Sequence, residues 1–333
     1  MNIAEKEAAL VRLGQYLAGN SPELTAVKER AFIANGWFTP PFIDISLDNI
    51  CRYFLEPAAL RQWLSRYPAV ENTREPRQVG IVAAGNIPLV GFHDWLCGFV
   101  SGHRVKMKLS SKDEILMRHI LDKMTEWYPE TAGQTEVQDM LKNCDAYIAT
   151  GSNNSARYFN YYFSKYPNII RHNRTSVAVL TGTESPEELE ALADDVMLYF
   201  GLGCRNVTKV MVPEGYNFDA LLNALRKYDY LADHHKYKNN YDYNLALLLL
   251  NNSPYLTNGC ILLHEAESLF SPLSVLHYGY YKDIQQLRHD LAAHPELQTI
   301  AGNGFTPFGQ AQQPSLNDYA DGVDTMAFLL GLS

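Results

Sequence analysis

The fold of this chain is decided by a stretch of changing character, QVGIVAAGNIPLVGFHDWLCGFVSGHRVKMKL at residues 78–109. It begins with a β-branched run at 78–84, passes through Gly-Asn-Ile-Pro, continues as a helix-like segment at 89–101, and ends in a second strand-like run at 104–109. Strands rich in valine and isoleucine that alternate with helices are typical of a parallel sheet covered on both faces. The stretch therefore predicts an α/β fold.

The same alternation continues toward the middle of the chain. Ser185 followed by Pro186 and two glutamates is typical of a helix start. By contrast, Asp229 to Tyr243 is dense in Tyr, His, Asn and Asp and looks like a polar segment with little periodicity. The other elements predicted after the first stretch are strands near 145–150, 176–181, 208–212, 261–264 and 274–278, and helices near 112–128, 152–165, 185–200 and 322–331.

Length and composition limit the classes of function. A chain of 333 residues is long enough for two domains. The formal net charge of −9, with no basic stripe, argues against nucleic acid as a partner. Five widely spaced cysteines without Cys-x-x-Cys, and a charged N-terminus, favour a reducing cytoplasm. No stretch is apolar for long enough to predict a transmembrane helix, and the adjacent His234 and His235 are poor joint ligands, so we expect no metal.

One cysteine lies in surroundings that favour chemistry. The run YFGLGCRN at 199–206 connects a helix-like segment to a strand-like one, and its glycines let the backbone turn tightly and leave the sulfur of Cys204 accessible. Upstream, Asn86 follows the first strand and carries an amide that can donate to an oxyanion. An accessible thiol and such an amide are the minimal equipment for acyl transfer. The alternative roles are a packed thiol for Cys204 and a helix cap for Asn86.

Four short segments follow one another along the chain: GNIP at 85–88, SGHRVKMKLS at 101–110, TGS at 150–152 and GLGC at 201–204. Together they resemble the aldehyde dehydrogenase superfamily, and more closely its acyl-CoA reductase family, typified by the fatty acid reductase component of bacterial luminescence. The resemblance implies a Rossmann-like parallel-sheet cofactor domain plus an α/β catalytic domain. We expect an N-terminal helical region at 1–75, the cofactor domain at 76–200 with part of the C-terminal tail, and the catalytic domain with that tail at 201–333.

The resemblance also implies roles for single residues. Cys204 is the expected nucleophile and Asn86 the expected oxyanion donor. Glu267 resembles a glutamate that grips the nicotinamide ribose, although it lies one position early. The other residues implied to bind cofactor are Lys108 and Ser110 in the strand that holds the adenosine ribose, Ser111 and Lys112 after it, and Gly151 and Ser152 in a turn nearby. The structural alternatives are a solvated lysine for Lys108 and a capped turn for Gly151 and Ser152.

The residues after Ser110 bear on the choice of cofactor. Members of the superfamily that prefer NAD often carry a glutamate there, and this chain carries Ser111 and Lys112. A hydroxyl and a cation accept a 2′-phosphate that a carboxylate would repel. We therefore expect NADPH rather than NADH.

A second departure concerns release of the acyl group. Hydrolytic members carry a glutamate where this chain has RHNR at 171–174. Without a general base for water, exchange with a thiol such as coenzyme A is the easier interpretation. The expected function is reduction of a fatty acyl-CoA to the aldehyde through a thioacyl intermediate on Cys204, within fatty acid metabolism. The alternatives are an aldehyde dehydrogenase that works in the acylating direction, and a non-catalytic relative that binds nucleotide or acyl-CoA. The resemblance also implies a homodimer.

Overall fold

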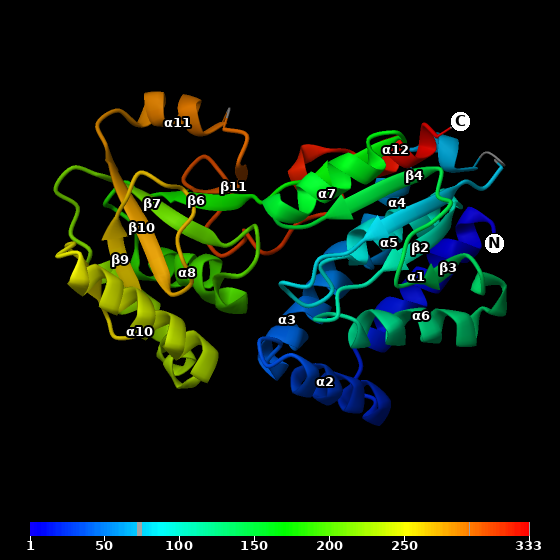
Figure 1. The fold of residues 1–333 in the computed structure, drawn as a ribbon, viewed down its shortest axis with the longest axis horizontal. Coiled ribbons are helices and arrows are strands. Elements are labelled where there is room, and N and C mark those ends of the chain that lie inside the picture. The colour runs from blue at the N-terminus through cyan, green and yellow to red at the C-terminus, as the bar shows by residue number, and fades with distance from the viewer. Residues whose placement is uncertain (72–74, 293, 333) are drawn as a thin grey trace. The chain divides into compact units, whose positions relative to one another are not determined.

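Two mainly parallel sheets organise the chain in a computed structural model (Figure 1). The structure describes residues 1–71, 75–292 and 294–332. The chain divides into two compact units, each built on one of the sheets. Residues 1–173 and 314–333 form the first unit, and residues 174–313 form the second.

A series of helices precedes the first strand. Asn2 and Glu5 form a reciprocal capping box at the start of the first helix, and Leu10, Leu13 and Leu17 are buried along one of its faces. The predicted helical character of the N-terminal region is confirmed. Its helices are α1 (Ile3–Leu17), α2 (Pro22–Ala34), α3 (Pro40–Asn49), the π-helical turn η1 (Ile50–Phe54), α4 (Pro57–Leu64) and the short η2 (Pro68–Glu71).

The first sheet has the strand order β3-β2-β1-β4-β5, and all of its pairs are parallel. Its central strand places Val79 opposite Val105 on one side and Ala146 on the other. The strands are β1 (Gln78–Val82), β2 (Arg104–Lys108), β3 (Thr135–Val137), β4 (Ala146–Thr150) and β5 (Asn168–Arg171). The connecting helices are α5 (Phe92–Ser101), α6 (Ile115–Trp127) with the short η3 (Pro129–Thr131), and α7 (Asn153–Phe163).

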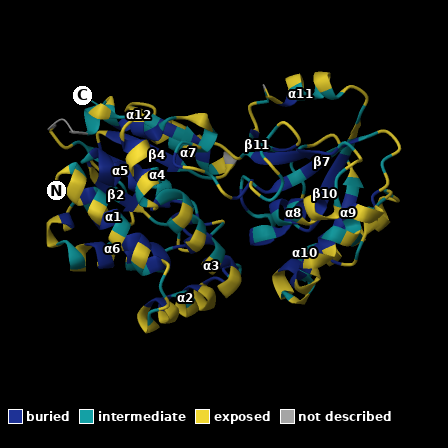
Figure 2. Ribbon diagram, turned by 180° about the vertical axis from the view of Figure 1, so that it is seen from behind, coloured by how far each residue is buried: buried dark blue, intermediate teal, exposed yellow. Residues whose placement is uncertain are grey.

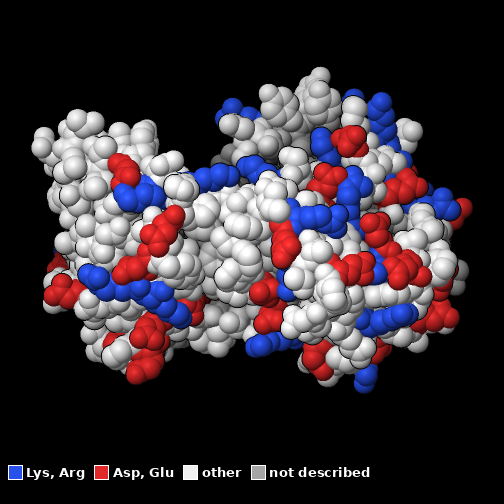
Figure 3. Space-filling view, turned by 90° about the horizontal axis from the view of Figure 1, so that it is seen from below, with Lys and Arg blue, Asp and Glu red and all other residues white. Residues whose placement is uncertain are grey.

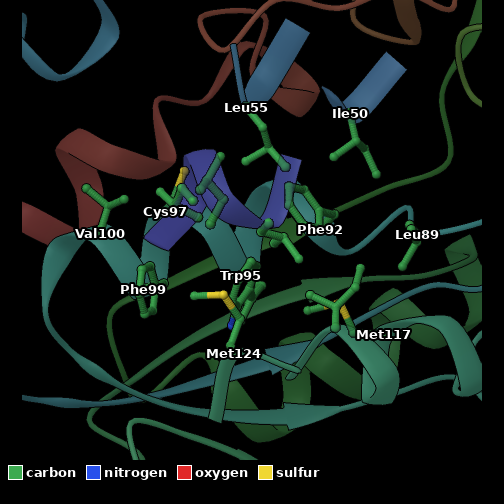
Figure 4. Packing of buried hydrophobic residues seen from close by; sticks show 14 of the residues in the cluster. Ile50, Leu55, Leu89, Phe92, Trp95, Cys97, Phe99, Val100, Met117 and Met124 are labelled. Atoms are coloured by element: carbon green, nitrogen blue, oxygen red, sulfur yellow. The ribbon is translucent and has the colours of Figure 1, made fainter. Parts of the chain in front are cut away.

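The core of the first unit is built around α5. Phe92, Trp95 and Phe99 are at most 1% exposed and stack along one side of this helix, with ring centroids 5.3 and 5.5 Å apart between neighbours (Figure 4). A helix that is apolar on nearly every face must be covered on all sides, and α5 is buried along almost its whole length (Figure 2). Gly102, the C-cap residue that follows the helix, adopts a left-handed conformation (φ 84°), which turns the chain into β2.

The end of the chain returns to the first unit and packs on α5. The last helix is α12 (Thr325–Leu330), preceded by the short η6 (Ala320–Gly322). A buried ion pair joins this segment to the sheet. Nη1 and Nη2 of Arg171 both contact the carboxylate of Asp94, and Nη2 also donates to Thr325 Oγ1 at 2.9 Å. Arg171 therefore connects β5, α5 and α12.

The second sheet has the order β11-β6-β7-β10-β9-β8, in which only the β8–β9 pair is antiparallel. The central strands of both sheets are buried, whereas the outer faces of α2 and α10 are exposed (Figure 2). The strands are β6 (Thr175–Val179), β7 (Val207–Pro213), β8 (Leu256–Thr257), β9 (Leu262–Glu265), β10 (Val275–Tyr281) and β11 (Leu297–Gly302). The helical elements are α8 (Pro186–Met197), η4 (Leu198–Gly201), α9 (Asp219–Ala224), η5 (Leu225–Asp233), α10 (His235–Leu250) and α11 (Ile284–Ala292).

The polar segment at 229–243, which shows little periodicity in the sequence, has regular structure. It is helical, formed by the end of η5 and most of α10. Tyr237, Tyr241 and Asn244 are spaced by one helical turn and form the buried face of α10. Tyrosine and asparagine at these positions hide the periodicity from a count of aliphatic residues. Within the described part of the chain, no helix combines the length and the apolar character needed to cross a membrane.

The predicted α/β fold is confirmed, but the strands divide differently between the units than the expected limits imply. The first unit ends at Asn173, not at residue 200. The reason is strand pairing. β6 forms hydrogen bonds with β7 and β11, so β6 belongs to the second sheet and the following α8 to the second unit. The expected return of part of the tail to the cofactor domain corresponds to residues 314–333 in the first unit.

We predict that Arg171→Met destabilises the first unit by about 3–5 kcal/mol, because it leaves the carboxylate of Asp94 buried without its partner. Replacing both residues, Arg171→Met with Asp94→Leu, should cost much less. Urea unfolding followed by tryptophan fluorescence reports on this unit alone, because all four tryptophans lie in it: Trp37, Trp63, Trp95 and Trp127.

The matched control is Arg52→Met, because Arg52 forms an exposed pair with Asp48 at 3.9 Å. An exposed pair of this kind contributes only about 0–1 kcal/mol. If Arg171→Met unfolds at the same urea concentration as this control, the buried pair does not have the proposed role.

Candidate active site

Cys204 follows a turn with an uncommon backbone. Tyr199 (φ 54°), Phe200 (φ 58°) and Gly201 (φ 76°) adopt left-handed conformations in succession. For the two non-glycine residues this costs roughly 1–3 kcal/mol each, so the surrounding structure must hold them there. Both aromatic side chains are buried, and the ring of Phe200 packs 5.8 Å from that of Tyr237 in α10. The tight turn predicted from the glycines is present, and aromatic packing fixes it.

The amide of Asn206 holds this turn together from inside. Its Oδ1 accepts from the N–H of Gly203 at 2.8 Å, and its Nδ2 lies 3.1, 3.3 and 2.9 Å from the carbonyl oxygens of Asp195, Val196 and Leu198. The carbonyl groups at the C-terminal end of a helix have no partner within that helix. Asn206, which is 0% exposed, therefore satisfies the end of α8 and positions the residue before the candidate nucleophile.

Cys204 itself is partly exposed, and its carbonyl oxygen accepts from Ser176 Oγ at 3.1 Å. The backbone of the candidate nucleophile is thus anchored to β6, and the residue stays partly exposed. Cys51 is also partly exposed, but burial raises the pKa of its thiol to about 11. The remaining cysteines are buried: Cys97, Cys144 and Cys260.

Asp195 connects the end of α8 to a distant loop. Its carboxylate accepts from the N–H groups of Gly309 at 2.7 Å and Ala311 at 2.9 Å. Burial raises the pKa of this carboxyl to about 7, although the two N–H donors act in the opposite direction. The backbone carbonyl of Asp195 also accepts from Asn206 Nδ2. Asp195 therefore joins the turn before Cys204 to residues 309–311.

Asn86 lies in the loop that follows β1 in the first unit, and it is exposed. It does not cap α5, because that helix begins at Phe92 with Gly91 as its N-cap, so the alternative role is wrong. Gly85 packs tightly: a Cβ there would lie 2.5 Å from Ser110 Oγ. Only glycine fits at this close approach between the loops that follow β1 and β2.

Four of the candidate cofactor residues lie on the β2 side of this approach. Lys108 ends β2 and is exposed, and its carbonyl accepts from the N–H of Ala83 at 3.0 Å. Ser110 is half-buried, whereas Ser111 and Lys112 are exposed. The structure thus brings these four residues next to the loop of Asn86, at the carboxyl ends of parallel strands where ligands of α/β proteins bind.

Gly151 and Ser152 follow β4, the other neighbour of β1. Ser152 is the N-cap of α7, and its Oγ accepts from the N–H of Ser155 at 3.3 Å. A Cβ at Gly151 would lie 2.9 Å from the Cβ of Ser155 and 3.0 Å from the ring of Phe159. The capped-turn alternative is therefore correct as a local description, and it leaves the pair at the same sheet edge as the loop of Asn86.

Glu267 lies in the second unit, on the exposed loop after β9. Lys209 Nζ donates to the backbone carbonyls of Ala266 at 2.7 Å and Glu267 at 2.9 Å. Burial lowers the pKa of Lys209. Lys209 therefore fixes the backbone of this loop, and the side chain of Glu267 is exposed.

Histidines do not form a metal centre in the described residues, where no three His, Cys, Asp or Glu side chains gather around one point. His172 is exposed after β5. The ring of His234 packs against Phe200 at 4.7 Å. His234 therefore contributes to the packing of the turn before Cys204.

Charges of both signs are mixed on the surface. On the face drawn in Figure 3, Lys and Arg lie among Asp and Glu. Exposed pairs such as Lys28 and Asp44, at 2.8 Å, account for part of this mixing. A charged ligand would therefore be recognised by a few specific side chains, because mixed surface charges largely cancel at a distance.

Four buried polar residues that support the site were missed by sequence reasoning: Asn206, Asp195, Asp113 and Arg171. Each lies in or beside a predicted element, where a polar residue is usually assigned to the exposed face. The only available sign was an asparagine or aspartate directly beside a candidate segment. Their partners lie outside the local pattern.

Comparison with known proteins identifies the family of this chain, and the matched region contains most of the candidate site residues. A family model described as Acyl-CoA reductase (LuxC) matches residues 46–225, more than half of the chain, and the match includes Asn86 and Cys204. Glu267 lies outside it. A comparison with curated proteins gives no match.

Solved structures are similar over most of the chain. Indole-3-acetaldehyde dehydrogenase AldA of P. syringae, a mutant in complex with NAD+ and IAA, has a TM-score of 0.65 at 13% identity, covering 89% of this chain and 70% of that chain. A Mycobacterium tuberculosis aldehyde dehydrogenase complexed with NAD+ has a TM-score of 0.65 at 14% identity, covering 94% and 76%. The putative aldehyde dehydrogenase PutA from Anabaena variabilis has a TM-score of 0.64 at 13% identity, covering 94% and 77%. The fold is that of an aldehyde dehydrogenase.

We predict that Asn206→Ala lowers the stability of the second unit by about 3 kcal/mol, because it leaves several buried carbonyls and one N–H without partners. The unfolding of this unit can be followed in urea by the labelling of the buried Cys260, and that of the first unit by Cys97. Asn223→Ala, at an exposed position in α9, is the control. Equal urea midpoints for Cys260 labelling in the two variants would contradict the role of Asn206.

We predict a pH dependence of stability from Asp195. In the unfolded chain its pKa is about 3.9, whereas in the folded chain it is about 7. The folded state therefore holds its proton more tightly, and the free energy of unfolding should fall as the pH rises from about 4 to about 7, by up to about 1.4 kcal/mol per pH unit.

Asp195→Asn should remove this contribution, so the stability of the wild type relative to the variant should fall with rising pH in Cys260 labelling. Asp290→Asn, at an exposed carboxyl of the same unit, serves as the control. Parallel pH profiles for the wild type and Asp195→Asn would show that folding does not raise the pKa of Asp195.

Proposed function

The chain belongs to the acyl-CoA reductase (LuxC) family of the aldehyde dehydrogenase superfamily, and on this premise we propose that it reduces a fatty acyl-CoA thioester to the aldehyde with NADPH. Membership establishes an oxidoreductase of this superfamily. The thioester substrate, the acyl chain and the choice of NADPH are parts of the proposal.

The observation that carries the proposal is the position of Cys204 within the family match. The match at 46–225 contains both the candidate nucleophile and the candidate oxyanion donor. Cys204 is partly exposed and follows a turn that buried groups hold in a costly conformation. Strain that the surroundings maintain is common at active sites. A protein that only binds nucleotide needs neither this thiol nor this turn.

In the proposed mechanism, Cys204 reacts as the thiolate. Its sulfur forms a bond to the thioester carbonyl carbon, and the bond from that carbon to the coenzyme A sulfur breaks. The acyl group passes to Cys204, and coenzyme A leaves as the thiolate, which takes a proton from water. The amide of Asn86 and the backbone N–H of Cys204 donate to the oxygen that becomes negative, and one such donor contributes roughly 3–4 kcal/mol. After reduction, the bond to Cys204 breaks and the aldehyde leaves.

The loop after β2 supplies groups that fit the coenzyme. Ser111 and Lys112 are exposed beside Ser110, and no carboxylate takes the position directly after Ser110. The hydroxyl and the ammonium suit a 2′-phosphate, and the close packing of Gly85 against Ser110 keeps this loop beside the turn of Asn86. When bound, NADPH supplies the hydride that reduces the acyl group. The dehydrogenases of P. syringae and M. tuberculosis, which share the fold, were solved with NAD+.

The segment at 171–174 supports a thiol, rather than water, as the partner in acyl exchange. Arg171 is buried in its pair with Asp94, and His172 is exposed. The segment contains no carboxylate that could act as a general base toward water. A cytoplasmic location and a homodimer are further proposals, which rest on the cysteine content and on the family.

We expect purified protein to oxidise NADPH in the presence of acyl-CoA, with formation of one aldehyde per NADPH. Absorbance of NADPH follows the reaction with acyl-CoAs of several chain lengths, and the same series with NADH tests the coenzyme preference. Cys204→Ala should abolish the reaction, whereas Cys51→Ser, at the other partly exposed cysteine, should not change it. An unchanged rate in Cys204→Ala would overturn the mechanism, and a higher kcat/KM with NADH would overturn the coenzyme preference.

A further inference from the structure

Asp113 is a buried carboxyl that the mechanism above does not use. It lies in the loop between β2 and α6 and is 6% exposed. Its Oδ2 accepts from the N–H of Leu89 at 2.8 Å, and the N–H of Val90 also bonds to the carboxyl. Its other oxygen, Oδ1, has no hydrogen-bond partner within the described chain. A buried oxygen without a partner costs free energy. The hydrogen bonds from Leu89 and Val90 must therefore offset the cost of burying the Asp113 carboxyl.

The two N–H groups belong to the turn that carries Asn86. Leu89 has a φ of 58°, which is strained for a residue with a branched side chain, and its side chain is buried in the core (Figure 4). The carbonyl of Pro88 accepts from Ser46 Oγ at 2.8 Å. Proline has no N–H of its own, so the first N–H after it is that of Leu89. Asp113 therefore satisfies the part of the turn that its own backbone leaves unpaired.

The loop after β2 holds this turn at both ends. At one end, Gly85 lies directly against Ser110, where a Cβ would be 2.6 Å from the Cβ of the serine. At the other end, Asp113 holds Leu89. Asn86 is exposed between these two points. The direction of the Asn86 amide thus depends on a loop that lies 24 residues from Leu89 in the sequence.

We propose that Asp113 is a positioning residue, which holds the turn at 85–90 so that the amide of Asn86 is directed toward the oxyanion. The inference rests on the proposed function, in which Asn86 is the oxyanion donor. Burial raises the pKa of Asp113 well above the ordinary value for aspartate, against the effect of the two backbone donors. Asparagine is nearly isosteric with aspartate, and its Oδ1 can accept from Leu89 in the same way.

The test measures acylation of Cys204 by p-nitrophenyl hexanoate, which requires neither NADPH nor coenzyme A. The cysteine sulfur forms a bond to the acyl carbon, the ester C–O bond breaks, and p-nitrophenolate leaves in a burst of one per chain. Intact mass confirms the acyl group on the protein, and Cys204→Ala gives the background. Five variants are compared with the wild type: Asn86→Ala, Asp113→Ala, Asp113→Asn, the double variant of Asn86→Ala with Asp113→Ala, and Asp113→Ser, a second truncation in case the alanine variant does not fold.

We expect Asn86→Ala to slow the burst by about 10²–10³-fold, as for loss of an oxyanion donor. Asp113→Ala should slow it by about tenfold or more, and Asp113→Asn should stay within about threefold of the wild type. In the Asn86→Ala background, Asp113→Ala should add almost nothing, because a positioning residue acts through the group that it positions. Asp113→Ser should behave as Asp113→Ala does, because its hydroxyl is too short to reach Leu89.

Tryptophan fluorescence in urea establishes that each variant is folded, since every tryptophan lies in the first unit. A normal burst in Asp113→Ala, its full effect retained in the Asn86→Ala background, or no effect of Asn86→Ala would each overturn the proposal. The absence of a burst in the wild type would overturn it as well. A normal burst together with no oxidation of NADPH by any acyl-CoA would instead overturn the proposed function and leave the role of Asp113 intact.

Discussion

A backbone N–H or C=O group that is buried must find a hydrogen-bond partner, and the turns at the ends of strands and helices have too few partners of their own. In this protein, buried side chains meet that requirement at both candidate groups. Asn206 closes the turn before Cys204, and Asp113 closes the turn after Asn86. Asn206 lies three residues after Gly203, whereas Asp113 comes from another loop, 24 residues after Leu89. The candidate reactive groups are therefore held by groups that do not react.

This arrangement explains how a costly backbone persists beside the cysteine. Tyr199 and Phe200 are left-handed, and local preference alone would not keep them so. Their rings are buried, while Asn206 satisfies the carbonyls at the end of α8. Packing and hydrogen bonding thus fix the position of Cys204 before any ligand binds. A preorganised nucleophile does not have to be ordered during the reaction, which lowers the barrier.

Because its strands are parallel, the first sheet places the turn of Asn86 and the candidate coenzyme residues at the same edge. β2 and β4 flank β1, so the loops after these three strands meet at one end of the sheet. Gly85 brings the first two loops into contact, and a side chain there would separate them. The candidate coenzyme residues and the candidate oxyanion donor consequently share one structural support. A change in the loop at 109–114 should therefore affect coenzyme binding and acyl transfer together.

The sequence by itself determined the α/β class, the strands at the centres of the two sheets, the start of α8 at Ser185 and the turn before Cys204. These features depend on the spacing of apolar residues, on capping and on glycine, which are properties of neighbouring residues. Only the tertiary structure decided that β6 and α8 belong to the second unit, that residues 314–333 return to the first, and that Tyr237 and Tyr241 bury one face of α10. It also decided the buried polar pairs, because their members lie far apart, 24 residues for Asp113 and Leu89 and 77 for Arg171 and Asp94. A hydrogen bond between distant residues leaves no periodic pattern in either segment, so it becomes visible only when the chain has folded.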